Sequence, residues 1–162
     1  MFYIQLIGLL AFLVLVLSFY KKETDKILTY QVTSNFAYTI HYLLLGALSG
    51  AFCSLISMIR NLVYIKLKKY KMIIGILFII AYLTMCILFY EDIFSLLPFL
   101  ANSSYLMTII FNKKKILLIG AIISSICWII YSIHVLSYVS IITESVLILS
   151  NIIQLIKLRK VK

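Results

Sequence analysis

Residues 26–45 read KILTYQVTSNFAYTIHYLLL, and residues 114–133 read KKILLIGAIISSICWIIYSI. Each stretch opens with lysine before Ile-Leu and carries a large aromatic side chain at matching depth, Tyr38 in the first and Trp128 in the second. The tails YIKLKK and LIKLRK, further along the chain, also agree, and the offset between the two copies is about 90 residues. A repeat with this period predicts a chain built from two similar halves.

The composition around these copies is typical of a membrane protein. Hydrophobic residues make up 64% of the 162 residues and charged residues 12%, against about 25% charged in soluble domains. The formal charge of +10 would suggest nucleic acid in a soluble protein, but here the lysines lie in short clusters between apolar spans, as topology signals do. We therefore expect the lipid bilayer, and no nucleic acid, as the partner of this surface.

Apolar spans predict seven transmembrane helices joined by short loops. The spans lie at about 2–20, 27–46, 50–66, 72–90, 94–111, 116–134 and 138–157. Of the 15 basic residues, 14 follow the first, third, fifth and seventh spans, and the other is Arg60. These clusters are Lys21, Lys22, Lys26, Lys66, Lys68, Lys69, Lys71, Lys113, Lys114, Lys115, Lys157, Arg159, Lys160 and Lys162. The positive-inside rule then places the N-terminus outside and the C-terminus inside.

The repeat explains why the number of spans is odd. Two three-helix copies fused directly would point in opposite directions, and one inverting helix between them restores a parallel repeat. The span at 72–90 has no charge, amide or histidine in its core, so we expect it to be a connector that faces lipid. The predicted fold is an all-α polytopic membrane protein with a 3+1+3 arrangement: a first bundle at 1–70, a linker helix at 71–92 and a second bundle at 93–162.

Polar side chains recur at helical spacing in five of the seven spans, which predicts a wet cavity inside the bundle. A rise of 1.5 Å per residue places Tyr38 and Trp128 near the middle of the membrane, where two aromatic rings can form the walls of a pocket. Arg60, Asn61 and Asn151 lie nearer the lysine clusters and can close the pocket from below. The candidate solute-binding residues are Tyr38, Arg60, Asn61, Asn102, Trp128 and Asn151.

Each of these features also has a plainer interpretation. Large aromatic side chains can fill the gap between two bundles, and serines in membrane helices often serve only as hydrogen-bonding contacts between helices. The long side chain of Arg60 can snorkel to the nearer membrane surface instead of lining a pocket. The sequence leaves these alternatives open.

Glu144 and His41 lie at matching depth near the other membrane face by the same count. A carboxylate and an imidazole on facing helices can pass a proton, so this pair is the candidate for proton coupling. A structural hydrogen bond between the two side chains is the alternative.

Catalytic and metal-binding signatures are absent from the sequence. It contains no H-E-x-x-H, no G-x-S-x-G and no phosphate loop. Cys53, Cys86 and Cys127 are isolated in apolar spans without metal-type spacing, and we interpret them as packing residues. We therefore expect neither an enzyme nor a cofactor or metal.

Five short motifs in order carry a resemblance to a known family. They are IHYLLLG at 40–46, SMIRN at 57–61, SLLPF at 95–99, CWII at 127–130 and ITESVLILSN at 142–151. With them the chain resembles the YgjV-like bacterial inner-membrane family, which is related to the PQ-loop and SWEET repeat transporters. The resemblance implies location in the bacterial inner membrane. In SWEET proteins an asparagine on the third helix of each bundle and an aromatic on the second line the pocket, which implies that role for Asn61, Asn151, Tyr38 and Trp128.

The sequence also departs from the SWEET pattern. The proline expected on the first helix of each bundle survives only as Pro98, the one hinge candidate, and Gly8 stands where the other would be. Arg60 is unusual for a neutral sugar pocket and favours an anionic or carbonyl-bearing ligand. We expect a transporter of a small sugar-like or anionic solute, working by alternating access with or without proton coupling. A non-transporting receptor or stabilising subunit is the alternative, and a second copy of the chain is a further candidate partner.

Overall fold

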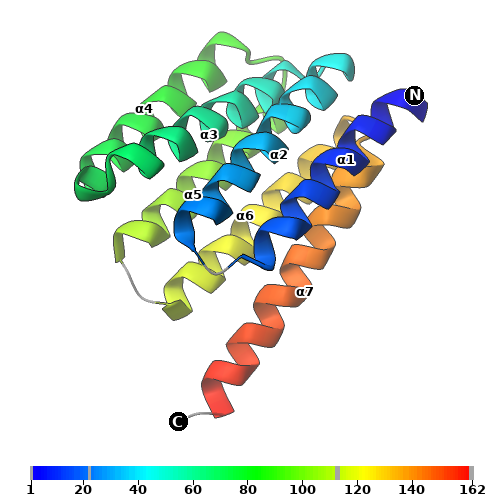
Figure 1. Cartoon of the computed structure of the whole chain (residues 1–162). Helices are drawn as coiled ribbons and strands as arrows, with labels where there is room; N and C mark the ends of the chain where they lie inside the picture. Colours follow the sequence, from blue (N-terminus) through cyan, green and yellow to red (C-terminus); the bar gives the residue numbers. More distant parts are fainter. Residues whose placement is uncertain (1, 22, 112–113, 161–162) are drawn as a thin grey trace.

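The computed structural model of the chain describes residues 2–21, 23–111 and 114–160. Within these ranges it holds seven α-helices, two short 3₁₀ segments and no strand (Figure 1). The helices are α1 (Phe2–Phe19), α2 (Thr24–Leu44), α3 (Leu48–Lys66), α4 (Lys71–Leu88), α5 (Leu97–Phe111), α6 (Lys114–His134) and α7 (Tyr138–Lys160), and the 3₁₀ segments are η1 (Lys68–Tyr70) and η2 (Ile93–Leu96). The predicted all-α polytopic fold is confirmed. Lys22, Lys113 and Lys162 of the predicted basic clusters lie outside the described residues.

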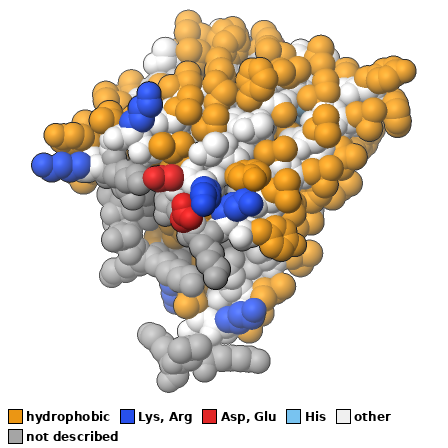
Figure 2. Space-filling model, viewed as in Figure 1, with side chains coloured by type: hydrophobic (Ala, Val, Ile, Leu, Met, Phe, Trp, Pro, Cys, Tyr) orange, Lys and Arg blue, Asp and Glu red, His pale blue; other side chains and the backbone are white. Residues whose placement is uncertain are grey.

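The helices differ in how apolar they are along their length. In the described part of the chain, three combine the length and hydropathy of a membrane span: Leu48–Lys66, Lys115–His134 and Tyr138–Leu158. Three shorter apolar helices are Phe2–Ser18, Met72–Leu88 and Ile93–Met107. Hydrophobic side chains cover most of the face seen in Figure 2, and the visible charged side chains gather toward its left and lower part. Such a surface suits contact with lipid.

The helices pack in an order that follows the chain. In the first half α2 lies against α1 and α3, and in the second half α6 lies against α5 and α7. The halves meet at two seams, one between α1 and α7 and the other between α3 and α5. α4 packs against both α3 and α5 and therefore covers the second seam only.

Short connections make neighbouring helices antiparallel, so the loops gather at two ends. The basic end, as we call it, holds the α1–α2, α3–α4 and α5–α6 connections and the end of α7, with residues such as Lys21, Lys66 and Lys157. The far end holds the start of α1 and the α2–α3, α4–α5 and α6–α7 connections, with Glu91 and Asp92.

Two of the three far-end connections, those after α2 and after α6, fold alike at an offset of 90 residues. After α2 the Gly46 N–H donates to Leu43 O at 3.0 Å and the Ala47 N–H to Tyr42 O at 2.9 Å. After α6 the Leu136 N–H donates to Ile133 O at 3.3 Å and the Ser137 N–H to Ser132 O at 2.9 Å. Both are Schellman turns with a left-handed residue, Gly46 at φ 75° and Leu136 at φ 57°. The repeat seen in the sequence thus also holds for these two turns.

α4 does more than face lipid. Tyr82 of this helix is completely buried, and its hydroxyl lies 2.7 Å from Ser57 Oγ of α3. The opposite face of α4 carries exposed residues such as Leu77 and Ile87. The expectation of a plain lipid-facing connector was therefore wrong in one respect: its buried tyrosine joins the polar interior of the bundle.

Candidate functional site

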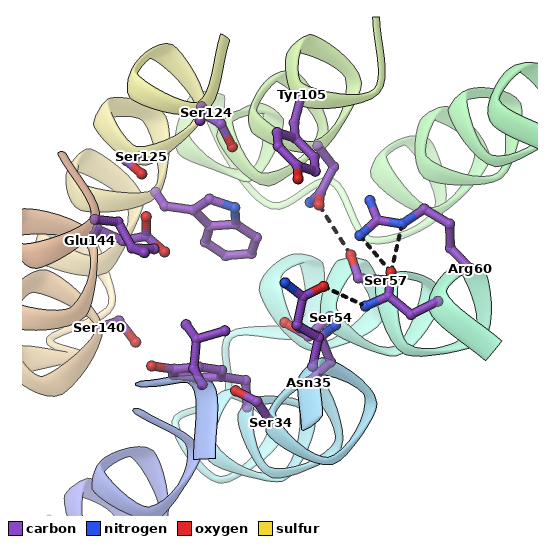
Figure 3. Close-up of a pocket in the computed structure, with 18 of the residues that line it drawn as sticks. Ser34, Asn35, Ser54, Ser57, Arg60, Tyr105, Ser124, Ser125, Ser140 and Glu144 are labelled. Carbon is purple, nitrogen blue, oxygen red and sulfur yellow. Dashed lines mark hydrogen bonds between the residues drawn. The ribbon is translucent and has the colours of Figure 1, made fainter. Parts of the chain in front are cut away.

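A cavity of ≈ 280 Å³ lies among α1, α2, α3, α5, α6 and α7. All six residues predicted to bind solute line this cavity, and Glu144 lines it as well. Its polar lining consists of Gln31, Ser34, Asn35, Ser54, Ser57, Arg60, Asn61, Asn102, Ser124, Ser125, Ser140, Glu144 and Asn151, together with the hydroxyls of Tyr38, Tyr42 and Tyr105. The polar stripes of the helices therefore converge on one space (Figure 3).

The aromatic wall is a stack of three rings and not a facing pair. Trp128 stacks on Tyr42 with centroids 5.6 Å apart, and Tyr42 stacks on Tyr38 with centroids 6.2 Å apart. Tyr42 thus stands between the two residues that sequence reasoning paired. Tyr42 lies one turn after Tyr38 on the same face of α2, and this spacing could have identified it as a lining residue from the sequence.

Arg60 is buried beside the cavity, with 6% of its surface exposed. Its Nε and Nη2 both donate to Asn61 Oδ1, at 3.2 and 3.1 Å, and its Nη1 donates to Tyr82 Oη at 3.3 Å. The guanidinium carbon lies 6.0 Å from the centre of the Tyr105 ring. These contacts hold the guanidinium inside the bundle, so the snorkelling alternative does not describe this side chain.

A hydrogen-bonded chain continues from Arg60 across the seam between α3 and α5. Ser57 Oγ lies 2.7 Å from Tyr82 Oη and donates to Asn102 Oδ1 at 3.1 Å. Asn102 Nδ2 in turn donates to Pro98 O at 2.8 Å. Asn102 is therefore held by both halves and by the start of its own helix.

Pro98 lies in the first turn of α5, directly after η2. Proline is tolerated there because the first-turn N–H groups lack an intrahelical acceptor, so Pro98 does not break the helix. Its role as a hinge stays a prediction.

The two asparagines of the third and seventh helices both reach the cavity but differ in their surroundings. Asn61 is buried at 2% exposure, and its Nδ2 donates to Gln31 Oε1 at 3.4 Å. Asn151 is half-buried on α7 and lies nearer the basic end. Asn61 is thus a supporting residue for Arg60, whereas Asn151 borders the more open part of the lining.

The structure does not bring Glu144 and His41 together, which corrects the pairing expected from their depth. His41 Nδ1 lies 2.8 Å from Ile4 O, and Nε2 lies 2.7 Å from Ser137 Oγ. Both ring nitrogens are therefore occupied by other groups. Glu144 faces the cavity from α7, close to Ser125 in Figure 3.

At the far end, side chains of one half reach helices of the other. His41 of α2 contacts Ser137 at the start of α7. Tyr131, its counterpart 90 residues later, accepts the Gly50 N–H of α3 at 2.9 Å and shares a hydrogen bond with Ser49 Oγ at 2.9 Å. Two further contacts of this kind are Tyr38 with Thr143 at 2.8 Å and Tyr42 with Ser132 at 3.4 Å. These contacts between the halves were not predicted from the sequence, although His41 and Tyr131 occupy equivalent positions of the repeat, 90 residues apart.

The exposure of the lining differs between the two ends. Tyr42 and Ser140, the lining residues nearest the far end, are 3% and 2% exposed. Gln31, Leu117 and Asn151, nearer the basic end, are half-buried. Arg60 and Asn61, also toward the basic end, are only 6% and 2% exposed, so the more exposed lining there belongs to α2, α6 and α7.

A bundle of apolar helices around a polar cavity defines a polytopic helical membrane protein. A family model described as bacterial inner membrane protein, Imp-YgjV, matches residues 2–162, and the chain belongs to this family. The family expected from the five motifs is thereby confirmed, and the chain is a bacterial inner membrane protein. No curated protein and no solved structure matches the chain. The relationship to PQ-loop and SWEET transporters stays a prediction.

Proposed function

We propose that the chain transports a small polar solute across the inner membrane by alternating access, with the described cavity as the solute site. The observation that carries the proposal is a polar cavity between two similar halves, lined by residues of both. The lining suits a solute with an apolar ring face or an anionic group, such as a sugar-like molecule or a small anionic metabolite. The ring faces of Tyr42 and Trp128 suit an apolar ring face, and the guanidinium of Arg60 suits a carboxylate or phosphate.

The unequal closure of the two ends supports the same proposal. Hydrogen bonds from residues such as Tyr38, His41 and Tyr131 join the halves at the far end, where the lining is buried. Toward the basic end, Gln31, Leu117 and Asn151 are half-buried. An alternating-access protein passes between a state in which one end of the site is closed and a state in which the other end is closed. In the proposed topology the basic end faces the cytoplasm, and residues 1–70 rock against 93–162 with 71–92 as the linker.

Proton coupling stays part of the proposal, but through Glu144 alone. The nitrogens of His41 are taken by Ile4 and Ser137, so this ring cannot exchange a proton directly with Glu144 in the state described. His41 serves instead in the closure of the far end.

Accessibility of the cavity from both membrane faces tests the proposal. Ser54 lines the cavity in the middle of the bundle, and Ser54→Cys gives a thiol that an impermeant reagent can label in sealed vesicles of either orientation. Alternating access predicts labelling from both faces. Tyr131→Phe removes the hydroxyl that binds Ser49 and Gly50, so it should accelerate labelling from the far end.

The matched control is Tyr138→Phe, because Tyr138 is 56% exposed at the same end. The native cysteines Cys53, Cys86 and Cys127 set the background, which labelling of the parent chain measures. Labelling of Ser54→Cys from one face only, in both the parent and the Tyr131→Phe background, would reject transport and favour the receptor or stabilising-subunit alternative.

A further inference from the structure

Arg60 and Glu144 bring opposite charges to one cavity from opposite walls, Arg60 from α3 and Glu144 from α7 (Figure 3). We propose that the solute is a zwitterion, whose carboxylate binds Arg60 and whose ammonium group lies at Glu144. The inference rests on the proposed function, since it names the chemical class of the solute for the same cavity.

The donors of Arg60 are only partly used. A guanidinium has five N–H groups. The Nε and Nη2 side of the group donates to Asn61 Oδ1, and Nη1 donates once to Tyr82. One N–H on each terminal nitrogen is then left without a partner among the described residues. Two such donors on neighbouring nitrogens can pair with the two oxygens of a carboxylate.

The charge of Arg60 is also uncompensated in the described part of the chain. Its recorded partners are an amide, a phenol and an aromatic ring, all neutral. The two ion pairs between described residues, Lys26 with Glu23 and His134 with Asp92, lie outside the cavity. A buried charge without a counter-ion is costly, and an anionic group of the solute supplies that counter-ion.

The other wall offers what an ammonium group needs. Glu144 provides a carboxylate, and the hydroxyls of Ser124, Ser125 and Ser140 lie around the same part of the cavity in Figure 3. Trp128 adds an aromatic ring to this lining, and a cation over such a ring is stabilised by the electron density of its face. Among the described lining residues Arg60 is the only lysine or arginine, so no basic side chain competes for Glu144.

The remaining solute classes leave a charge unsatisfied. A neutral sugar would leave both Arg60 and Glu144 without a counter-ion. A simple anion would satisfy Arg60 alone, and a simple amine would satisfy Glu144 alone. A zwitterion satisfies both and carries no net charge of its own into the apolar interior of the membrane.

The test is binding of a matched set of probes to the purified full chain. γ-Aminobutyrate, butyrate and butylamine share four carbons and differ only in their charged groups. Each is titrated while the thermal unfolding midpoint is followed, because a ligand that binds only the folded state stabilises it by RT ln(1 + c/Kd) at free ligand concentration c, so the dependence of the midpoint on concentration gives the affinity. We expect γ-aminobutyrate to bind about 10- to 100-fold tighter than either singly charged probe, as a lost charge-assisted hydrogen bond would predict. Glycine, β-alanine and 5-aminovalerate then give the charge separation that fits best, and phosphoethanolamine distinguishes a lipid headgroup from a free amino acid.

Two variants test which charged side chain binds which end of the solute, because each should abolish the preference for γ-aminobutyrate over one singly charged probe. Glu144→Gln should bind butyrate as tightly as γ-aminobutyrate, because the ammonium group then has no counter-ion. Arg60→Gln should bind butylamine as tightly as γ-aminobutyrate for the converse reason. Glu23→Gln removes an exposed carboxylate of the basic end and should keep the parent preference.

Three results would overturn the zwitterion proposal: equal binding of butyrate and γ-aminobutyrate by the parent chain, a larger midpoint shift with glucose, or no shift with any probe of the series. Each of these leaves labelling of Ser54→Cys from both faces untouched, and with it the proposed transport. Tight zwitterion binding together with one-sided labelling would instead reject transport and keep the ligand class.

Discussion

Tyr131 fits against Gly50 because Gly50 lacks a side chain. The Gly50 N–H donates to the Tyr131 hydroxyl at 2.9 Å, and a Cβ built on Gly50 would lie 2.5 Å from Tyr131 Cε1. The two residues belong to α3 and α6 and therefore to different halves of the chain. The close approach of ring and backbone at this point is part of the closure of the far end.

Gly50→Ala should destabilise the protein by about 1–3 kcal/mol, because the added methyl group must displace the Tyr131 ring or the α3 backbone. The control is Gly75→Ala in α4, where a Cβ would meet only Tyr64 Oη at 3.5 Å, an ordinary contact. That change should stabilise by roughly 0.5–1 kcal/mol, as alanine does in a helix. Unfolding in detergent measures both, and a Gly50→Ala protein as stable as the parent would contradict the close fit.

Leu136→Gly should stabilise the protein by about 1 kcal/mol. Leu136 holds φ 57° in the turn after α6, a conformation that costs a side-chain-bearing residue about 1–2 kcal/mol and glycine almost nothing. Gly46→Leu at the equivalent turn should lower stability by a similar amount, although a Cβ there has open space around it. Opposite signs for the two variants in thermal unfolding would confirm the backbone argument, and equal signs would refute it.

Tyr82→Phe should cost about 1–3 kcal/mol of unfolding free energy, because it leaves Arg60 Nη1 and Ser57 without their shared partner in a buried site. Tyr90→Phe, at a 54% exposed tyrosine just beyond α4, provides the control and should be neutral. A cost that is equal in the two variants would mean that the Tyr82 hydroxyl is dispensable.

Asp92 gives a pH-dependent prediction at the far end. Desolvation raises the pKa of Asp92, but hydrogen bonds from Ser95 and the His134 ring 2.7 Å away outweigh it, so the net pKa lies below 3.8. A lowered pKa stabilises the folded state at pH values above the unfolded pKa, and that contribution is lost as the pH falls through the folded pKa. Asp92→Asn should therefore lower the thermal midpoint at pH 7, and the difference from the parent should vanish under strongly acidic conditions.

The control for Asp92 is Glu91→Gln, which removes the neighbouring exposed carboxylate of the same connection and should leave the thermal midpoint close to that of the parent. A difference between Asp92→Asn and the parent that persists to the lowest accessible pH would assign the effect to lost packing and not to charge.

The sequence allowed the helices to be predicted to within three residues of their observed ends, because long apolar spans and lysine clusters report directly on membrane crossing. It also identified Arg60, Asn61 and Asn102 as cavity residues, because polar side chains in an apolar helix must face other helices or a wet cavity. Both inferences need only the residue pattern within a single helix.

Contacts between helices were harder to predict. Depth alone paired Glu144 with His41, but the rotation of α2 turns the imidazole toward Ile4 and Ser137. Gly8 was interpreted as a replaced proline, yet a Cβ there would lie 3.0 Å from the His41 ring, so its small size serves the packing of that ring. Tyr82 was overlooked because tyrosine counts as apolar in a span, and only its neighbours in α3 show that its hydroxyl is used.

The single covering helix makes the two seams mechanically unequal. α4 contacts both α3 and α5, and through Tyr82 it is hydrogen-bonded to the same Ser57 that binds Asn102 of the other half. No helix of the described chain spans the seam between α1 and α7 in this way. In the proposed alternating access, α4 restrains movement of the halves along α3 and α5, whereas the other seam is joined at the far end by Gln5 of α1, whose Nε2 donates to Leu136 O at 3.0 Å. If the halves move as proposed, the thickness and lateral pressure of the bilayer bear most directly on the seam between α1 and α7, which no third helix of the described chain covers.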